Sequence, residues 1–562
     1  DYFNDLKKQF CKFIEQRFLS ITLSIANAHT VEFYTHDVWK RFVAVPPEEV
    51  LSAVSSEQSN TTFGFCNDTK RLVDTQELVQ AAKAHSLPGL GFCMSREELL
   101  QDLRETRIGD NAGLSWAAFE PDEFMNSKKS HEVQYMSEVV ACLAQHCRVK
   151  QVIDVGSGKG YLSSFLSLQY GLRVYGIDSS STNTHGAQER NRKLKKFSRA
   201  YQKHTKAGRS QTEATHSPQE ELIERKPGVN VGEDVLSDNG PRNLSQEEER
   251  VLTSSSDINP AVEGHSEQNS ETDELFLSAL SMDVIQSASP RVPPSQLSAE
   301  ERERRKRENL ERKAQNGADS TRAVFSPLTS YVTAETELRE LINELEDAVV
   351  VGLHTCGDLA PSTLRMFVAK PELAAVCSVG CCYHLLSEEF DPCLQSVCGF
   401  PLSQYLRDQS CFCSRNARMS ACLIQMESLF YRAVLHVILR DHYSSYKSEK
   451  RVGNVYSKAK SFVDYVRRAL RRLELDESKL SDSDIQDYHN TYRVRMDEMH
   501  AFNMLKVTLA PCIEGLILLD RLCYLKEQED VSFSALVQLF DPLLSPRCYA
   551  VIGLKMRIKC TD

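Results

Sequence analysis

The sequence predicts an α/β protein built on a parallel, doubly wound sheet, with a helical N-terminal domain and large insertions. Apolar runs that end in an acid or a histidine alternate with helical patterns, as a parallel sheet requires. One of these runs enters a glycine-rich turn that opens a helix, which is where such sheets bind ligands. The chain has 562 residues, enough for two or three folded parts.

Periodicity and composition divide the chain into six parts. The first, residues 1–120, has apolar residues at helical spacing in "LKKQFCKFIEQRFLSITLSI" and is expected to form a helical cap domain. Residues 199–322 are rich in Ser, Glu, Gln, Asn and Pro and are expected to be a disordered acidic insert. The insert interrupts a ligand-binding domain, which is expected over 121–198 and 323–384. A helical insertion for substrate handling is expected over 385–528, and a hairpin that completes the sheet over 529–562.

The expected elements follow in order from short apolar patterns. Val133, Met136, Val139, Val140 and Leu143 lie at helical spacing and predict a helix before the first strand. The first strand is expected at the run that ends in Asp154, and the next four at 172–178, 323–332, 348–354 and 373–382. A helix is expected between the third and fourth strands, over 336–347. The link "DPLLSPR" separates 531–540 from 548–556, which predicts a terminal antiparallel hairpin.

The glycine turn "DVGSGKGY" identifies the class of ligand. A dinucleotide fingerprint would need a third glycine where Tyr161 stands, and the chain contains no phosphate-binding G-x-x-x-x-G-K-[ST] run. The observed spacing resembles the nucleoside-binding turn of class I (Rossmann-like) S-adenosylmethionine (SAM) methyltransferases. Its acid is expected to offset a ligand ammonium, and its glycines to admit the nucleoside. The residues concerned are Asp154, Gly156, Gly158 and Gly160.

Two further features are in register with this turn. Asp178 ends the next expected strand, 18 residues after Gly160, where a carboxylate can accept both ribose hydroxyls; the alternative is that it caps the following turn. Lys128 and Lys129 lie at the start of the preceding helix. They can pair with a ligand carboxylate or form a solvated helix cap.

Polar residues follow the fourth and fifth expected strands, where the chemistry of open α/β sheets takes place. His354 and Asp358 are candidates to orient or deprotonate a hydroxyl or nitrogen nucleophile. Tyr383 could stack a ring or simply pack, and His384 is either catalytic or a hydrogen-bonded core histidine. The fourth strand lacks the Asn-Pro-Pro-aromatic run that accepts an exocyclic amine, which disfavours amino methylation of adenine.

The cysteines suggest two other chemistries, neither of which we expect. Cys356 with Cys381 or Cys382 could attack a pyrimidine ring, but the Pro-Cys context of that chemistry is missing. A zinc site from Cys393, Cys398, Cys411 and Cys413 has only C-x-C spacing. We therefore predict no metal site. The 18 cysteines show no pairing framework, so reduced thiols in the cytosol or the nucleus are expected.

The charge distribution bears on partners. The net charge of the chain is −11, but residues 213–301 alone carry −14 and the remainder +3. One helix over 456–475 carries a basic row that would fit RNA phosphates; a solvated face is the alternative. The row consists of Arg467, Arg468, Arg471 and Arg472. No apolar stretch is expected to reach the ~18 residues of a membrane span, so we predict no membrane contact.

Several motifs together resemble the methyltransferase-like protein 25 family. They are "MNSKKSHEV", "DVGSGKGYLS", "GLHTCGDLAPSTLR", "GCCYHLL", "RNARMSAC", "SKAKSFVDYVRRAL", "HAFNMLKVTLAPCIEGLILLDRLCYLKEQ" and "LFDPLLSPR". The resemblance implies a SAM-dependent methyltransferase with a ribosomal RNA adenine dimethylase-like domain, and adds Lys128, Lys129 and His131 to the donor site. "LHTCGD" and "GCCYH" are also similar to a pair in tRNA 2′-O-methyltransferases.

These observations together predict a SAM-dependent methyltransferase whose acceptor is RNA. Two alternatives stay open: a protein or small-molecule methyltransferase, and a non-catalytic module that binds SAM.

Overall fold

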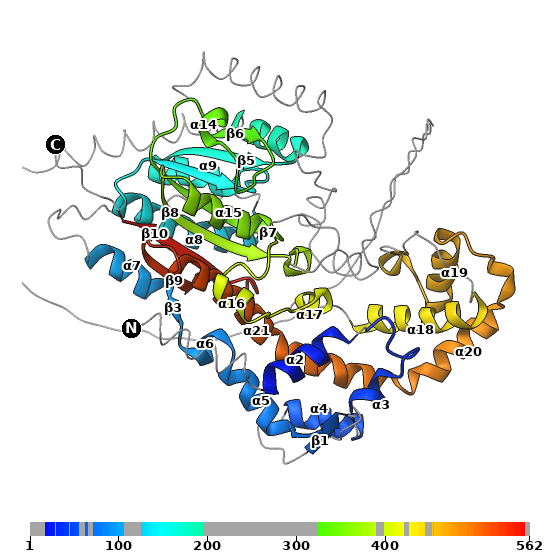
Figure 1. Ribbon diagram of the computed structural model, residues 1–562. Coiled ribbons are helices and arrows are strands. Elements are labelled where there is room, and N and C mark those ends of the chain that lie inside the picture. The colour runs from blue at the N-terminus through cyan, green and yellow to red at the C-terminus, as the bar shows by residue number, and fades with distance from the viewer. Residues whose placement is uncertain are drawn as a thin grey trace, which may run out of the picture. The chain divides into compact units, whose positions relative to one another are not determined.

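The computed structural model describes most of the predicted folded parts (Figure 1). The described residues are 17–28, 30–43, 45–55, 62–65, 71–105, 125–192, 194, 324–388, 398–420, 426–443, 452 and 455–556. The predicted insert over 199–322 and Cys393 lie outside them.

Eight strands of the described residues form one sheet, in the order β3-β9-β10-β8-β7-β4-β5-β6. The strands are β3 (Cys93–Ser95), β4 (Gln151–Val155), β5 (Arg173–Asp178), β6 (Ser326–Thr329), β7 (Ala348–Cys356), β8 (Leu373–Cys381), β9 (Val531–Gln538) and β10 (Tyr549–Lys555). Strands β4 to β8 are parallel, and β10 runs antiparallel between β8 and β9. The carboxyl ends of the parallel strands therefore meet at one edge, as predicted.

Both faces of the sheet are buried, which explains why its central strands are apolar along their whole length. Val152 and Val349 belong to a core that includes α8 (Ser127–His146) and α9 (Tyr161–Tyr170). Their neighbours Ile153 and Val350 belong to a second core, on the face of α15 (Leu359–Ala369). The alternation of the strands thus assigns successive residues to opposite cores.

Some expected elements differ from those observed. The strand expected over 323–332 is limited to β6, and the helix expected over 336–347 is only α14 (Leu338–Leu341). Ile342 already has an extended backbone, yet it and Leu345 are buried. Their helical spacing reflects burial in an irregular segment. The sequence pattern could not distinguish a helix from a buried irregular segment, because both put apolar residues into the core.

The N-terminal region contains strands that periodicity did not predict. The hairpin of β1 (Thr62–Phe65) and β2 (Arg71–Asp74) is separate from the main sheet, whereas β3 joins its edge parallel to β9. The helices of this region are α2 (Arg17–Asn27), α3 (Val38–Phe42), α4 (Pro47–Ser55), α5 (Thr75–Ala84), α6 (Leu87–Leu90) and α7 (Arg96–Glu105). The first part of the chain thus extends the sheet as well as contributing helices.

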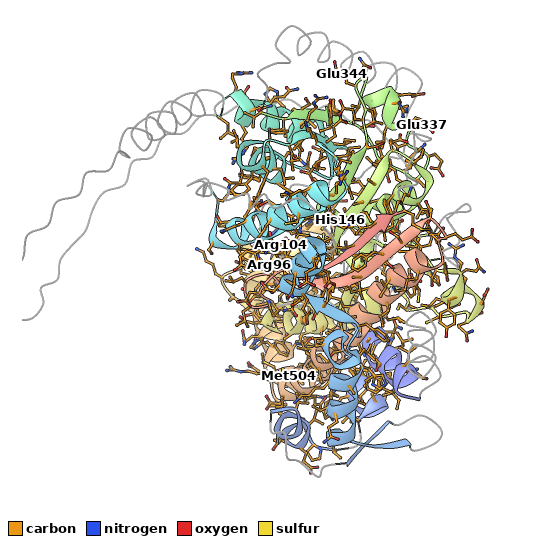
Figure 2. All side chains as sticks on the ribbon, turned by 90° about the vertical axis from the view of Figure 1, so that its left-hand side faces the viewer. Arg96, Arg104, His146, Glu337, Glu344 and Met504 are labelled. Atoms are coloured by element: carbon orange, nitrogen blue, oxygen red, sulfur yellow. The ribbon has the colours of Figure 1, made fainter. Side chains whose placement is uncertain are left out.

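Helix α7 fixes this region to α8. Arg96 donates to Glu138 at 2.8 Å and lies 4.1 Å from the centre of the Tyr135 ring, while Arg104 pairs with Glu138 at 3.7 Å. Figure 2 labels Arg96, Arg104 and His146; His146 Nδ1, in the last turn of α8, lies 3.4 Å from the Leu103 carbonyl oxygen of α7. Helix α8, which precedes β4, is therefore held in place by α7.

The long helix α21 (Met496–Lys526) is the centre of the second core. It contacts α2, α4, α5 and α18 (Met426–His442) as well as β9. By length and composition it could cross a membrane, so our expectation that no stretch is long and apolar enough is wrong. Most residues in the apolar stretch of α21 are buried inside the protein, as in the core helix of a soluble fold.

The other helices of the second half follow β8. They are α16 (Gln404–Asp408), α17 (Arg415–Ser420), α19 (Phe462–Arg472) and α20 (Asp482–Arg493). Helix α19 packs through Phe462, Val466 and Ala469, the face that the sequence predicts. It contacts α18 and α20.

Candidate functional site

The glycine turn has the conformation that its glycines permit. Gly156, Gly158 and Gly160 have φ values of 73°, 56° and 73°, in the left-handed region that favours glycine. A Cβ on Gly160 would lie 2.2 Å from the Phe325 ring. By contrast, no atom of the described residues lies within 4 Å of a Cβ placed on Gly158. The space beside Gly158 is therefore open.

Asp154 lies under this turn as a buried carboxylate. Ser163 of α9 donates to it at 2.6 Å. Burial raises the pKa of Asp154 to about 7, because the hydrogen bond from Ser163 only partly compensates the loss of solvent. A positive charge placed at this end of β4 would favour the ionised form.

Asp178 connects the turn to the end of β5. Its carboxylate accepts from the backbone N–H of Gly158 at 3.0 Å and from that of Ser180 at 2.8 Å. Asn183 Nδ2 donates to it at 3.1 Å. Asp178 therefore does cap the following turn, and the same contacts fix it beside Gly158, where a ribose role also requires it.

The structure separates the three basic candidates of α8. Lys129 lies 4.7 Å from the centre of the Tyr161 ring, at the glycine turn. Lys128 pairs with Glu132 at 3.7 Å. His131 Nε2 accepts from the backbone N–H of Asp541, in the β9–β10 link, at 3.0 Å. Lys129 thus lies beside the predicted donor site, whereas Lys128 and His131 contact neighbouring groups.

The sequence reasoning missed a cation at this position. Arg190 lies 4.1 Å from the centre of the Tyr161 ring and also contacts Ser164 of α9 at 3.4 Å. Together with Lys129 it makes the surroundings of Tyr161 positive, so either can attract a ligand carboxylate. Arg190 lies 30 residues beyond Gly160, so the motif alone gave no reason to select it.

His354 is positioned by a bulge in β7. The pairing with β8 shifts by one residue between Gly352 and Thr355, and such bulges often redirect a side chain near a site. His354 Nε2 lies 3.1 Å from Glu132 of α8, whose other oxygen accepts from Ser545 Oγ at 2.7 Å. The side chain of His354 is 32% exposed, whereas that of Glu132 is 1% exposed.

The sequence reasoning also missed Glu132. Burial would raise the pKa of this carboxyl, but the interactions with His354, Lys128 and Ser545 outweigh it and lower the pKa to about 2. The pair therefore resembles the carboxylate–histidine arrangements in which an acid orients an imidazole. The glycine turn is adjacent, since a Cβ on Gly156 would lie 3.7 Å from the His354 carbonyl oxygen.

Asp358 turns away from this pair to the segment after β8. Its Oδ1 accepts from the backbone N–H of Ser387 at 2.9 Å. A Cβ on Gly399 would lie 1.9 Å from the same oxygen. Burial raises the pKa of Asp358. These contacts favour a role in holding the loop after β8, and its predicted action on the acceptor stays a prediction.

Tyr383 and His384 lie in the interior beyond β8. Tyr383 donates to Glu514 of α21 at 2.9 Å and is 1% exposed, so its ring packs and is not accessible for stacking. Burial raises the pKa of Tyr383 well above its ordinary value. His384 is 2% exposed, and burial lowers its pKa to about 4. Their proposed catalytic roles remain predictions that this burial does not favour.

Cysteines from β7 and β8 lie next to His354. Cys356 Sγ and Cys381 Sγ are 3.0 Å apart. Contact with Cys356 raises the pKa of Cys381 well above its ordinary value, so its thiol is protonated. A protonated thiol is a poor nucleophile, so this state of Cys381 does not favour attack on a ring carbon, and the expectation for the three cysteines stays a prediction.

The predicted RNA-binding row of α19 is partly engaged within the protein. Arg467 binds Asp482 at 2.6 Å and donates to the Leu480 carbonyl at 2.8 Å. Arg468 donates to Asp464 at 2.8 Å. Arg471 pairs with Glu477 at 3.6 Å. Arg471 and Arg472 are the exposed members of the row.

The donor half of the site fits S-adenosylmethionine. The space beside Gly158 is open, a buried Asp154 lacks a cationic partner among the described contacts, and Asp178 contacts the backbone N–H of Gly158. These groups complement a flat nucleoside, an ammonium and a pair of hydroxyls. The turn lacks the G-x-x-x-x-G-K-[ST] pattern of a triphosphate-binding loop.

Comparisons with known proteins agree with this reading. Residues 128–389 match a family described as a methyltransferase domain. The chain is 47% identical to the mouse "Probable methyltransferase-like protein 25" over 96% of this chain and 95% of the mouse protein. It is 46% identical to the human protein of that name over 96% of each. No solved structure matches the chain. The predicted class I methyltransferase fold is confirmed.

Proposed function

Since this chain belongs to the methyltransferase-like protein 25 family, we propose that it transfers the methyl group of S-adenosylmethionine to RNA at the carboxyl ends of β4 and β7. The observation that carries the proposal is the adjacency of the open glycine turn to the His354–Glu132 pair. A donor site and a candidate proton acceptor thus share one edge of the sheet.

The donor would be held by residues of β4, β5 and α8. Asp154 would face the ammonium, Asp178 the ribose hydroxyls, and Lys129 the carboxylate. When bound, SAM supplies an electrophilic methyl group on a positively charged sulfur. The protein mainly has to align an acceptor with that group, since in-line positioning supplies much of the rate of a transfer.

His354 would handle the acceptor. Glu132 occupies Nε2 of the ring, which leaves Nδ1 to accept a hydrogen bond or a proton from a hydroxyl or nitrogen. Glu132 acts through His354 and is therefore a positioning residue. The partial exposure of His354 allows contact with an acceptor, whereas Tyr383 and His384 are enclosed.

RNA as the acceptor rests on the basic row of α19 and on the resemblance noted in the sequence. Arg471 and Arg472 are exposed, and the ion pair of Arg468 with Asp464 is partly exposed. Exposed ion pairs contribute about 0–1 kcal/mol, so backbone phosphates can displace them.

Donor binding is tested by calorimetry with SAM. We expect the wild-type chain to bind, Asp178→Ala to lose most of the affinity, and Asp347→Ala to bind normally. Asp347 is an exposed acid that precedes β7, at the opposite end of the strand. Equal affinity of Asp178→Ala and wild type would contradict the ribose assignment, and absence of binding to the wild-type chain would contradict SAM as the donor.

The acceptor is tested by mass spectrometry of RNA nucleosides and of protein digests from cells that lack the chain. Loss of a methylated nucleoside supports RNA, and loss of a methylated peptide decides for protein. In a purified assay, His354→Ala should lose transfer and retain SAM affinity. Arg471→Ala/Arg472→Ala should weaken RNA binding and reduce its salt dependence, whereas Arg339→Ala, an exposed arginine of α14, should do neither.

A further inference from the structure

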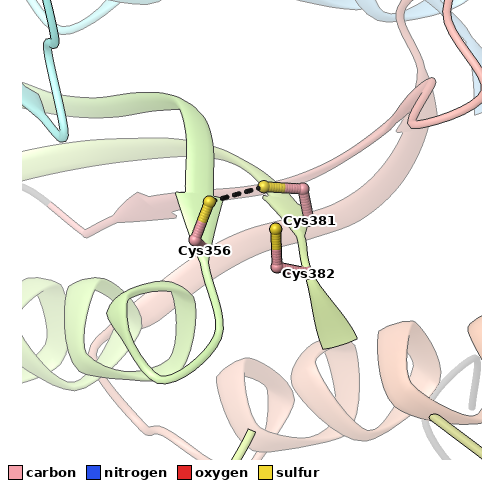
Figure 3. Close-up of side chains that lie close together, drawn as sticks. All are labelled: Cys356, Cys381 and Cys382. Carbon is pink, nitrogen blue, oxygen red and sulfur yellow. Dashed lines mark hydrogen bonds between the residues drawn. The ribbon is translucent and has the colours of Figure 1, made fainter. Parts of the chain in front are cut away.

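Three cysteine thiols converge where β7 and β8 end. The Sγ atoms of Cys356, Cys381 and Cys382 all lie within 4.8 Å of one another. Figure 3 shows them pointing into the same small space, with the 3.0 Å contact between Cys356 and Cys381 drawn as a dashed line. The methyl transfer proposed above uses none of these thiols.

Two backbone irregularities create this convergence. The register shift in β7 places Cys356 directly opposite Cys381. Cys382 has φ 52° and ψ 49°, a left-handed conformation that costs about 1–2 kcal/mol for a residue other than glycine. Successive residues of a strand point to opposite faces. The left-handed turn is therefore what brings the thiol of Cys382 back beside that of Cys381.

A buried cation lies beside the thiols. Arg521 of α21 is 2% exposed, and a Cβ on Gly380 would lie 2.1 Å from its Nη1. Its charge interacts with Tyr383 and Asp520 and, less strongly, with Cys381, and its Nη2 has no hydrogen-bond partner among the described residues. A buried guanidinium without full pairing is costly, and negative charge at the thiols would compensate it.

We propose that Cys356, Cys381 and Cys382 bind one zinc ion. Zinc–thiolate bonds of about 2.3 Å place tetrahedral sulfurs about 3.8 Å apart. One Sγ–Sγ separation in the cluster is 3.0 Å and none exceeds 4.8 Å, which is compatible with this value. Soft thiolate ligands select zinc over magnesium or calcium. The ion thus fits the space with small side-chain movements.

Charge balance is consistent with the site. Each thiol releases one proton to solvent, so Zn²⁺ and three thiolates carry a net charge of −1, which Arg521 neutralises. Three protein ligands with an open fourth position are typical of catalytic zinc, whereas structural zinc has four. The open position would lie toward Cys356, the half-buried member of the cluster, on the strand that carries His354.

A disulfide between Cys356 and Cys381 is the competing interpretation. It would need only two thiols and would leave the third, that of Cys382, unused. Cys381 and Cys382 are also 8% and 6% exposed, which restricts access of an oxidant. The third thiol and the cation therefore favour a metal.

The test measures metal directly on the full-length chain, purified without chelator. Elemental analysis should give about one zinc per chain, and zinc should be lost in Cys356→Ala, Cys381→Ala and Cys382→Ala. Cys377→Ala is the matched control, since Cys377 is a buried cysteine of the same strand, β8, and should retain the metal. Thermal melting of each variant separates loss of metal from loss of fold.

Cobalt substitution gives a second readout that needs no variant. Adding Co²⁺ to the chelator-treated wild-type chain should produce thiolate-to-cobalt absorption bands of a tetrahedral site, and added Zn²⁺ should remove them. Absence of these bands and of bound zinc would overturn the proposal. So would copper in place of zinc, metal retained by all three variants, or a Cys356–Cys381 disulfide in metal-free protein as isolated.

Discussion

Glu132 connects three separate elements through one carboxylate. It lies on α8, contacts His354 of β7, and accepts from Ser545 in the β9–β10 link. A buried carboxylate without partners would be protonated or would destabilise the fold. Because these partners keep it ionised, Glu132 can hold the orientation of His354 across a wide pH range.

Replacing Glu132 with Gln tests this at the scale of one residue. The pKa of Glu132 is lowered from 4.5 to about 2, so its stabilisation is complete above pH 4.5 and is lost as the pH falls toward 2. We expect Glu132→Gln to lower the free energy of unfolding at pH 7 by about 3 kcal/mol. The deficit should narrow below pH 4.5 in urea titrations.

The same substitution separates positioning from folding in the enzyme assay. If Glu132 orients His354, Glu132→Gln should lower kcat and leave the affinity for SAM unchanged. Glu132→Asp, which retains the charge, should restore part of the turnover. A deficit in unfolding free energy that stays constant from pH 7 to pH 3 would contradict the assigned charge state.

Asp154 predicts a pH dependence of donor binding. Burial raises its pKa from 3.8 to about 7, so the free protein carries a proton here below neutral pH. A bound ammonium would favour the carboxylate and expel that proton. SAM affinity should therefore rise toward pH 7 and level off above it, by up to about tenfold per pH unit below the pKa.

Calorimetry in two buffers of different ionisation enthalpy measures the proton released on binding. Asp154→Asn keeps the size of the side chain and can still accept from Ser163. It should bind more weakly and show no proton release. Release that is unchanged in this variant would assign the proton to another group.

At the scale of elements, alanine substitutions in the glycine turn distinguish an effect on the stability of the fold from an effect on SAM binding. Gly158 and Gly160 both have positive φ, so alanine should cost each variant about 1–2 kcal/mol of strain. Only at Gly160 would the new Cβ also clash with a side chain, because it would lie 2.2 Å from the Phe325 ring. Gly160→Ala should therefore destabilise the fold more than Gly158→Ala.

Gly158→Ala should instead weaken SAM binding, because the methyl group of the alanine enters the open space beside the turn. Thermal melting gives the first comparison, and SAM titration of the folded protein gives the second. A Gly158→Ala variant with normal stability and normal SAM affinity would show that the donor does not approach this glycine.

At the scale of the whole molecule, the two ends of the 199–322 insert are joined without its help. Asn191 Nδ2 donates to the Phe325 carbonyl at 2.5 Å, and Thr184 and Thr329 share a hydrogen bond of 2.6 Å. We expect a short Gly/Ser linker in place of 199–322 to leave the SAM affinity and the melting temperature close to wild type. A large loss of affinity would mean that the insert contributes to the site.

The sequence by itself determined the succession of the parallel strands along the chain, the glycine turn and the acids that end β4 and β5. These features depend on local chemistry, since an apolar run, a positive φ and a strand-end carboxylate are each visible within a few residues. The same holds for the apolar face of α19. The expected helix over 336–347 shows the limit, because burial without a helix produces the same spacing.

Only the tertiary structure paired His354 with Glu132, 222 residues apart, and directed Asp358 toward Ser387. It also gathered Cys356, Cys381 and Cys382 into one cluster, through a bulge and a left-handed cysteine. Such contacts depend on how elements distant in sequence pack and on the register of β7 against β8. A one-residue shift reverses the direction of a side chain, and no pattern within β7 alone specifies that shift.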